Sequence, residues 1–199
     1  MTMYYKLRIS LAYIENFLYL CRDYRKYIIH KNTNMKKTFF LSIAVCLLAS
    51  CGKLTVDNTP VASIELDRYV GTWYEIARFD HSFERGLTQP QAEYSLREDG
   101  KISVVNTGLK DGKEKRSTAV AKTTDTPALL RVSFFRPFYG DYRVLLLDED
   151  YQYALVGGSS DDFLWILARQ PQLDEETKSL ILTEAQRRGY DTSKLLWMY

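Results

Sequence analysis

Eight short segments rich in β-branched and aromatic residues follow one another at nearly regular spacing between residues 72 and 168. Turn-forming residues separate them, and the pairs Asp99-Gly100 and Asp111-Gly112 favour tight β-hairpins. Because no long crossover fits between successive segments, neighbouring strands should run antiparallel. The pattern predicts a closed up-and-down barrel or a sandwich, with strands at residues 72–79, 92–97, 102–107, 117–122, 128–135, 142–147, 153–156 and 163–168.

One longer helix is predicted after the last strand. Asp174 is a suitable N-cap, and apolar residues recur behind it at helical spacing. Gly189 is placed to cap the other end. We expect this amphipathic helix to lie on the outside of the β structure, and one further helical turn to form near residues 64–69.

A secretion signal lies inside the chain rather than at its first residue. Lys36 and Lys37 precede an apolar run that is too short for a membrane-spanning helix. Leu48-Ala49-Ser50-Cys51 matches the lipobox of bacterial lipoproteins, whose cysteine is lipidated and begins the mature chain. A core helix that ends in a chance cysteine would not need the lysine pair. We predict a signal peptide at residues 35–50, lipidation of Cys51 and a polar tether over residues 51–64.

The segment before this signal, residues 1–34, contains six tyrosines and several basic residues. Its best apolar run is interrupted by Glu15 and Asn16, so it suits neither a membrane span nor a core. The simplest interpretation is that translation starts at Met35. A genuine cytoplasmic extension is the alternative.

Charge and cysteine content limit the function of the mature chain. From Cys51 onward it has 19 basic and 23 acidic residues, a net charge of −4, which does not favour nucleic-acid binding. Cys21 and Cys46 precede the cleavage site, so lipidated Cys51 leaves no disulfide and no thiol nucleophile. Residues 65–199 are long enough for one domain with a single core.

Three motifs in order carry a resemblance to a known family. Residues 71–74 read Gly-Thr-Trp-Tyr at the start of the first strand, residues 148–151 read Asp-Glu-Asp-Tyr before the seventh, and Arg169 ends the eighth. Behind a lipobox, this order resembles the bacterial outer-membrane lipocalins. Glu149 stands where many lipocalins have threonine. The resemblance implies an all-β fold, an eight-stranded up-and-down antiparallel lipocalin barrel with one C-terminal amphipathic helix packed outside. It implies structural roles at the closed end, with Arg169 across Trp73, for Gly71, Trp73, Tyr74, Asp150, Tyr151 and Arg169.

Side-chain alternation predicts which residues face the barrel interior. An eight-stranded barrel can hold one small ligand, and this lining suits an acyl chain with a modest polar head. The alternative is that the same side chains simply fill the barrel as a packed core. Leu146 is expected inside and Ser133 outside. The predicted ligand-binding residues are Tyr94, Asn106, Val132, Phe134, Tyr142, Val144 and Trp165.

Two ionisable residues need separate treatment. Glu75 shares the inward face with Trp73, and a buried carboxylate needs a proton or a partner, either an arginine or a ligand headgroup. His81 is the one histidine after Cys51 and is expected to be a solvated loop residue. Without a second histidine or a free cysteine, we expect no metal site, no cofactor and no nucleophilic catalytic group.

The resemblance implies a non-enzymatic outer-membrane lipoprotein, held in the membrane by lipidated Cys51. Such proteins bind fatty acids, lysophospholipids or similar amphiphiles and support membrane maintenance by lipid carriage or storage. The resemblance also allows a homodimer. Two other classes stay open: a structural or interaction lipoprotein with a filled barrel, and a lipocalin-fold isomerase.

Overall fold

A computed structural model of the chain describes residues 56–199. The predicted upstream segment 1–34, the signal peptide 35–50 and the lipidation site Cys51 lie outside the described residues. Within residues 56–199, no helix is both long and apolar enough to cross a membrane.

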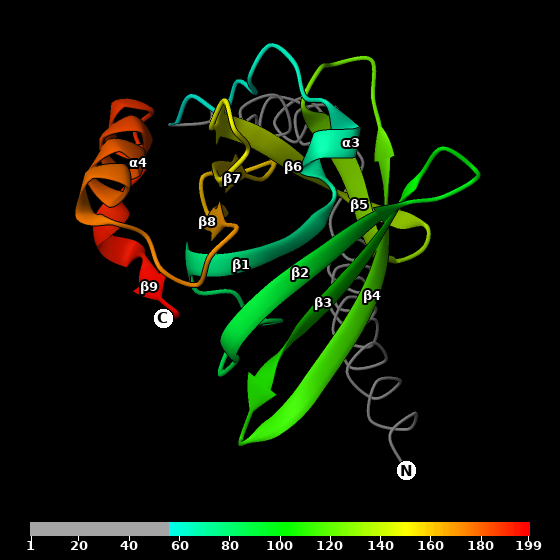
Figure 1. Cartoon of the computed structure of the whole chain (residues 1–199), viewed down its shortest axis with the longest axis horizontal. Helices are drawn as coiled ribbons and strands as arrows, with labels where there is room; N and C mark the ends of the chain where they lie inside the picture. The colour runs from blue at the N-terminus through cyan, green and yellow to red at the C-terminus, as the bar shows by residue number, and fades with distance from the viewer. Residues whose placement is uncertain (1–55) are drawn as a thin grey trace, which may run out of the picture. The chain divides into compact units, whose positions relative to one another are not determined.

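Eight antiparallel strands form a closed barrel, which confirms the predicted architecture (Figure 1). Each strand pairs with its neighbour in sequence, and β1 closes the barrel by pairing with both β2 and β8. A short helix, α3 (Leu66–Tyr69), precedes the first strand. The strands are β1 (Gly71–Arg78), β2 (Thr88–Leu96), β3 (Ile102–Lys110), β4 (Lys113–Thr123), β5 (Leu129–Phe135), β6 (Phe138–Leu147), β7 (Tyr153–Gly157) and β8 (Leu164–Ala168).

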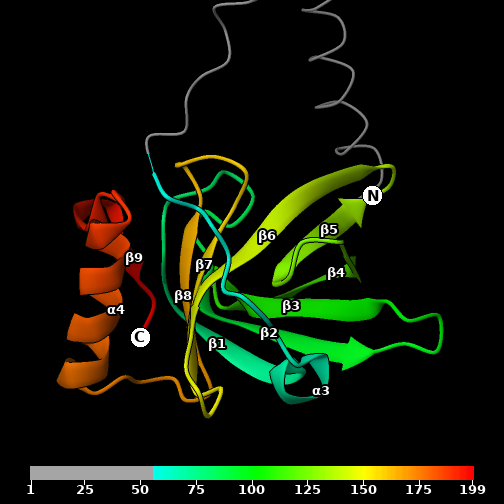
Figure 2. The same ribbon diagram turned by 90° about the horizontal axis from the view of Figure 1, so that it is seen from above.

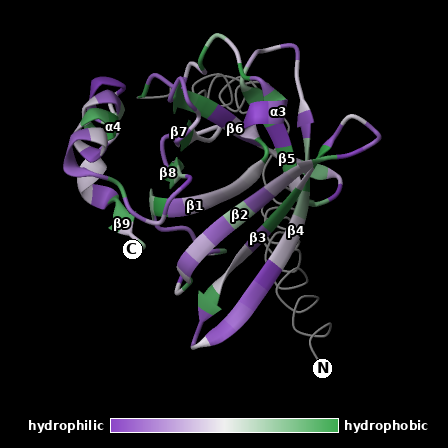
Figure 3. Cartoon of the chain, viewed as in Figure 1, coloured by the Kyte–Doolittle hydropathy of each residue, from purple (hydrophilic) through white to green (hydrophobic). Residues whose placement is uncertain are grey.

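The hairpin of β3 and β4 extends further than the sequence pattern predicts. A two-residue turn joins the strands, and both of its residues have positive φ, 53° at Asp111 and 69° at Gly112. The pairing then runs without a break from Lys110 opposite Lys113. The start of β4 is charged and exposed, so it shows no alternation of apolar residues that could reveal a strand (Figure 3).

Register shifts interrupt the pairing in β1, β2, β5 and β6, and the β-bulges in β1 and β6 change which side chains face the interior. One lies in β1 between Glu75 and Ala77, and the other in β6 between Val144 and Leu146. Beyond the second bulge the alternation is reversed: Leu146 packs against the outer core and Leu147 against the inner one. The expectation that Leu146 faces inward was therefore wrong, because simple alternation cannot register an extra residue.

Buried apolar residues form two cores. The inner core lies inside the barrel and includes Trp73, Ile102, Leu130 and Val144. The outer core lies between the barrel and α4 (Glu175–Arg187), whose Ile181 is fully buried. Asp174 caps α4 by accepting the Thr177 backbone N–H, as predicted.

The chain ends in elements that the sequence pattern did not predict. A 3₁₀ turn (Thr192–Lys194) leads into β9 (Leu196–Trp197), which pairs with Ala77 and Arg78 of β1. A two-residue strand is too short to show a periodic pattern. It occupies the edge of β1 beyond the last residue that pairs with β2.

The barrel has two distinct ends. We call the end with α3 and the β2–β3, β4–β5 and β6–β7 connections the floor end, and the other the open end. Residues 56–64, predicted as part of a tether, are instead packed along the barrel: the Asn58 side chain donates to Gly158 O at 3.3 Å, and Val61 N–H to Val144 O at 2.8 Å. Since Gly158 begins the β7–β8 connection, the described chain starts at the open end and runs to the floor (Figure 2).

Candidate functional site

Trp73 and Arg169 close the floor end. The Trp73 side chain is fully buried and its indole N–H donates to Tyr69 O at 2.7 Å. The Arg169 guanidinium lies 3.9 Å from the centre of the Trp73 ring, a cation–π contact. Arg169 also donates to the backbone carbonyls of Arg68, Tyr69, Val70, Thr72 and Tyr151. This end of the barrel is therefore sealed by structural residues.

The other motif residues support the same end. Gly71 has φ +96°, and a Cβ there would lie 3.4 Å from Arg169 Nη1. The Tyr151 hydroxyl accepts the Glu65 backbone N–H at 2.9 Å. Within the Asp148–Tyr151 turn, Asp148 accepts the backbone N–H of Asp150, so Asp148 holds the turn by its side chain. Tyr74 is different: it packs against the outer core and contacts the Tyr199 ring.

The predicted lining residues fall into three groups by depth. Tyr94 and Val144 are buried in the inner core. Val132, Tyr142 and Trp165 are partly buried and pack against that core. They lie at the edge of the inner core.

Asn106 and Phe134 lie nearer the open end. Asn106 is partly buried and its Oδ1 has no hydrogen-bond partner among the described residues. Phe134 is 52% exposed, so it does not belong to an enclosed lining as predicted. The register changes in β5 between Val132 and Phe135, and Phe134 lies in that irregular stretch. Its neighbour Ser133 is only 5% exposed, although it was expected on the solvent-facing side.

The inward face of the β3–β4 hairpin shows that the barrel is open toward the tip of this hairpin. Ala119 and Ala121 alternate into the inner core. Ser117 and Lys115 continue the same alternation toward the hairpin tip, yet both are exposed. Solvent therefore reaches the interior face of the hairpin.

Three tyrosine hydroxyl groups meet inside the barrel. The hydroxyl oxygens of Tyr69 and Tyr142 are 2.5 Å apart, and Tyr94 donates to Tyr142 at 3.2 Å. Burial raises the pKa of Tyr94 to about 12 and holds the pKa values of Tyr69 and Tyr142 well above their usual range. The three phenols are neutral, and Tyr69 packs on the Trp73 ring with centroids 5.0 Å apart. They form a polar step between the sealed floor and the open half.

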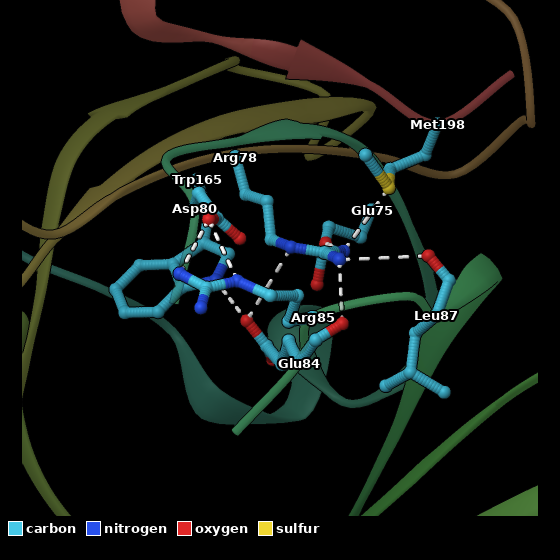
Figure 4. Close-up of polar contacts among 8 residues, drawn as sticks. All are labelled: Glu75, Arg78, Asp80, Glu84, Arg85, Leu87, Trp165 and Met198. Atoms are coloured by element: carbon cyan, nitrogen blue, oxygen red, sulfur yellow. Dashed lines mark hydrogen bonds and ion pairs between the residues drawn. The ribbon is translucent and has the colours of Figure 1, made fainter. Parts of the chain in front are cut away.

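A charged cluster lies under the β1–β2 connection. Glu75 is buried and ion-paired with Arg78, whose side chain is also buried, so its partner is an arginine (Figure 4). Arg78 donates to the carbonyl oxygen of Glu84 at 2.8 Å, and the Glu84 carboxylate accepts the Trp165 indole N–H at 3.2 Å. Two carboxylates thus share one guanidinium.

Burial raises the pKa values of both acids in this cluster. Burial, followed by the nearby Glu84 carboxylate, raises the pKa of Glu75 from 4.5 to about 7, although the Arg78 contact acts in the opposite direction. Burial also raises the pKa of Glu84. Near neutral pH the cluster therefore holds a proton that ordinary carboxyl groups would release.

His81 is not a solvated loop residue, which corrects the sequence prediction. It is 6% exposed and its ring stacks on Phe83 and Phe163, with centroids 5.2 and 4.8 Å away. Burial, followed by the charge on Arg78, lowers its pKa. Phe83 belongs to the same loop as His81, but Phe163 lies on the β7–β8 connection, so no local pattern predicts this burial.

Sequence reasoning did not assign Arg78 or Glu84 to the interior. Glu75 and Arg78 are three residues apart and would face opposite sides of a regular strand. The bulge between Glu75 and Ala77 brings them together. A strand-interior arginine so close to an inward glutamate is the one available signal.

A family model described as a lipocalin-like domain matches residues 64–199. The chain belongs to the lipocalin family. The sequence is 47% identical over 161 residues to outer membrane lipoprotein Blc of Escherichia coli K12, covering 78% of this chain and 91% of the relative. It is 41% identical over 167 residues to the protein of the same name in Vibrio cholerae, covering 81% and 98%. This lipocalin is therefore of the bacterial Blc type.

The fold also matches lipocalins of animals. Insecticyanin from the tobacco hornworm superposes with a TM-score of 0.60 at 21% sequence identity, over 71% of this chain and 83% of that one. At this identity the likeness concerns the barrel fold.

Proposed function

We propose that the mature chain is a lipid-anchored outer-membrane protein that binds amphiphilic lipids, fatty acids or lysophospholipids, in the open half of its barrel. Carriage or storage of such lipids supports membrane maintenance. The observation that carries this proposal is the arrangement of the interior. A sealed apolar floor lies below a partly buried ring of Val132, Tyr142 and Trp165, and polar groups lie above it.

Each part of this arrangement suits one part of an amphiphile. Apolar side chains of the ring can cover an acyl chain, and burial of each methylene contributes about 0.8 kcal/mol. The unpartnered Oδ1 of Asn106 can accept a hydrogen bond from a glycerol hydroxyl or a protonated carboxyl group. No step of this function requires a bond to be made or broken.

The names of the bacterial relatives support the location. Both are called outer membrane lipoprotein Blc, and this chain covers nearly their whole length. With the lipobox at Cys51, this supports an anchor in the outer membrane. The resemblance also allows a homodimer, which light scattering of the purified chain would test.

A filled barrel with a structural role is the second candidate, because the hydroxyl groups of Tyr69, Tyr94 and Tyr142 already satisfy one another in the middle of the interior. Incubation of the mature chain with a mixed bacterial lipid extract, followed by native mass spectrometry, separates the two. The proposed function predicts retained lipid of one class. A filled barrel predicts the mass of the protein alone.

A charge placed in the ring should abolish lipid retention. Val132→Glu would keep a carboxylate desolvated beside the acyl chain, which is strongly unfavourable. Thr118→Glu is the matched control, because Thr118 is exposed and lies on the outward face of β4. We expect native mass spectrometry to detect lipid on the control and none on Val132→Glu. Equal retention by both variants would mean that the ring does not contact lipid.

The anchor is tested separately. Cys51→Ala removes the thiol that accepts the lipid, so we expect the variant to leave the membrane fraction or to persist as an uncleaved precursor. Fractionation with a carbonate wash, followed by intact-mass measurement, distinguishes these products from the mature lipoprotein. A processed variant that stays wholly with membranes would contradict the anchor assignment.

A further inference from the structure

Phenylalanine side chains gather at the open end of the barrel. Within residues 56–199, all exposed phenylalanines lie on or beside two of its connections, Phe83 on β1–β2 and the others on the β5–β6 hairpin. Phe135 and Phe138 are 75% and 72% exposed. Their rings stack on each other with centroids 6.5 Å apart, and the residues face each other in the strand pairing. Exposed aromatic groups this close together are costly in water and indicate a binding surface.

Basic side chains lie on this hairpin and on the neighbouring strand β4. Arg136 at the hairpin tip is exposed. Further from the tip, Arg131 donates to Tyr139 O at 3.1 Å and is ion-paired with Asp141, and the Lys122 ammonium, from the floor-end part of β4, lies 4.7 Å from the centre of the Tyr139 ring. Aromatic side chains interleaved with basic ones are typical of surfaces that enter the headgroup region of a bilayer.

The floor end carries more acidic residues than basic ones. Its connections and α3 carry eight acidic residues, so it would be repelled by an anionic lipid surface. The four open-end connections, residues 79–87, 111–112, 136–137 and 158–163, carry five acidic and two basic residues. The adjoining ends of β3 and β4 add Lys110, Lys113, Lys115 and Arg116 against Glu114, so the two charges balance there, six of each. The acidic residues of the floor end are Glu65, Asp67, Glu98, Asp99, Asp125, Asp148, Glu149 and Asp150, against the basic residues Arg68, Arg97, Lys101 and Arg169.

The covalent chain also limits how the barrel can be oriented. The described chain starts at the open end, where Asn58 bonds Gly158 (Figure 2). Five residue steps separate Cys51 from Val56, which span at most about 18 Å. An anchor at Cys51 is therefore held within this distance of the point where Val56 lies, beside the open end, so the covalent chain favours an orientation with the open end toward the membrane.

We propose that the open end docks on the surface of the bilayer that holds the anchor, with Phe135 and Phe138 in its headgroup region. A lipid then passes between the bilayer and the barrel without crossing water. The proposal rests on the proposed function for the anchor at Cys51. The aromatic hairpin, the acidic floor and the exit of the chain each support this orientation independently.

Site-specific fluorescence on the lipidated mature chain tests the orientation. Its one cysteine is blocked by lipid, so Phe135→Cys and, at the floor end, Glu98→Cys each offer a single thiol for the environment-sensitive dye NBD. Both residues are exposed, so both variants should fold. In vesicles of phosphatidylethanolamine and phosphatidylglycerol, we expect emission at position 135 to shift to the blue, to rise severalfold and to be quenched by spin-labelled lipid. Emission at position 98 should stay that of a dye in water.

Vesicle flotation in the same samples separates the possible failures. Protein that does not float shows that the anchor assignment is wrong, and the orientation is overturned with it. Protein that floats while position 135 stays in water overturns the orientation alone. For the Cys51→Ala chain without lipid, emission at position 135 that rises with protein concentration would show that a second copy covers the hairpin, which also overturns the proposal.

Discussion

Arg78 lies between two acids, and its surroundings make stability depend on pH. Burial raises the pKa of Glu75 to about 7 from its ordinary 4.5. Between these values the unfolded chain has released a proton that the folded chain still holds, so the free energy of unfolding falls as pH rises through this window. The fall is at most about 1.4 kcal/mol per pH unit. Below pH 4.5 the stabilisation is complete, and above pH 7 it is lost.

Glu75→Gln should remove this fall because the amide does not titrate. Urea unfolding at pH 5, 6, 7 and 8 measures it, with Glu98→Gln as the control because Glu98 is exposed. We expect a flatter profile between pH 5 and 7 for Glu75→Gln and an unchanged one for the control. An unchanged profile in both variants would show that Glu75 titrates normally in the folded chain.

At the scale of single residues, the family motifs were predictable and the charged cluster was not. Trp73 and Arg169 lie in contact at the floor end, and their positions could be predicted because both belong to family motifs. The environment of Glu75 depends on a bulge in its own strand and on a loop nine residues further along the chain. His81 is buried by rings from two separate loops. Such long-range contacts leave no periodic pattern in the sequence.

At the scale of elements, the presence of the eight strands and of α4 was predictable, but the inward or outward direction of individual side chains was not. All eight strands and α4 form where alternation, turn residues and caps indicate them. The bulge in β6 places Leu146 outside, and the irregular pairing of β5 leaves Phe134 exposed. A strand that bends to close a barrel needs such extra residues, and their positions depend on packing rather than on composition.

Helix α4 should contribute to stability and not to lipid binding, because it packs on the outer core. Ile181 is fully buried, so Ile181→Ala should destabilise the fold by about 2–5 kcal/mol. The adjacent Leu180 is 47% exposed, and Leu180→Ala should change stability by less than about 0.5 kcal/mol. Urea unfolding measures both effects, and lipid titration should give equal affinities. Lost affinity in a folded Ile181→Ala variant would contradict the separation of the two cores.

At the scale of the whole molecule, the two ends of the barrel differ in character. The sealed and acidic floor lies at one end, and the aromatic hairpin, the charged cluster and the start of the described chain lie at the other. The tyrosine hydroxyl groups divide the interior between them. An acyl chain that enters from the open end should therefore stop at the hydroxyl groups of Tyr69, Tyr94 and Tyr142.

The most direct test of lipid binding in the barrel is affinity as a function of acyl chain length. Titration of the mature chain with saturated fatty acids of increasing length should show affinity rising by up to about 0.8 kcal/mol per methylene while the tail fills the open half. It should then level off once the tail reaches the tyrosine hydroxyl groups. Affinity that does not depend on chain length would contradict the account, because it would mean that the tail does not enter the barrel.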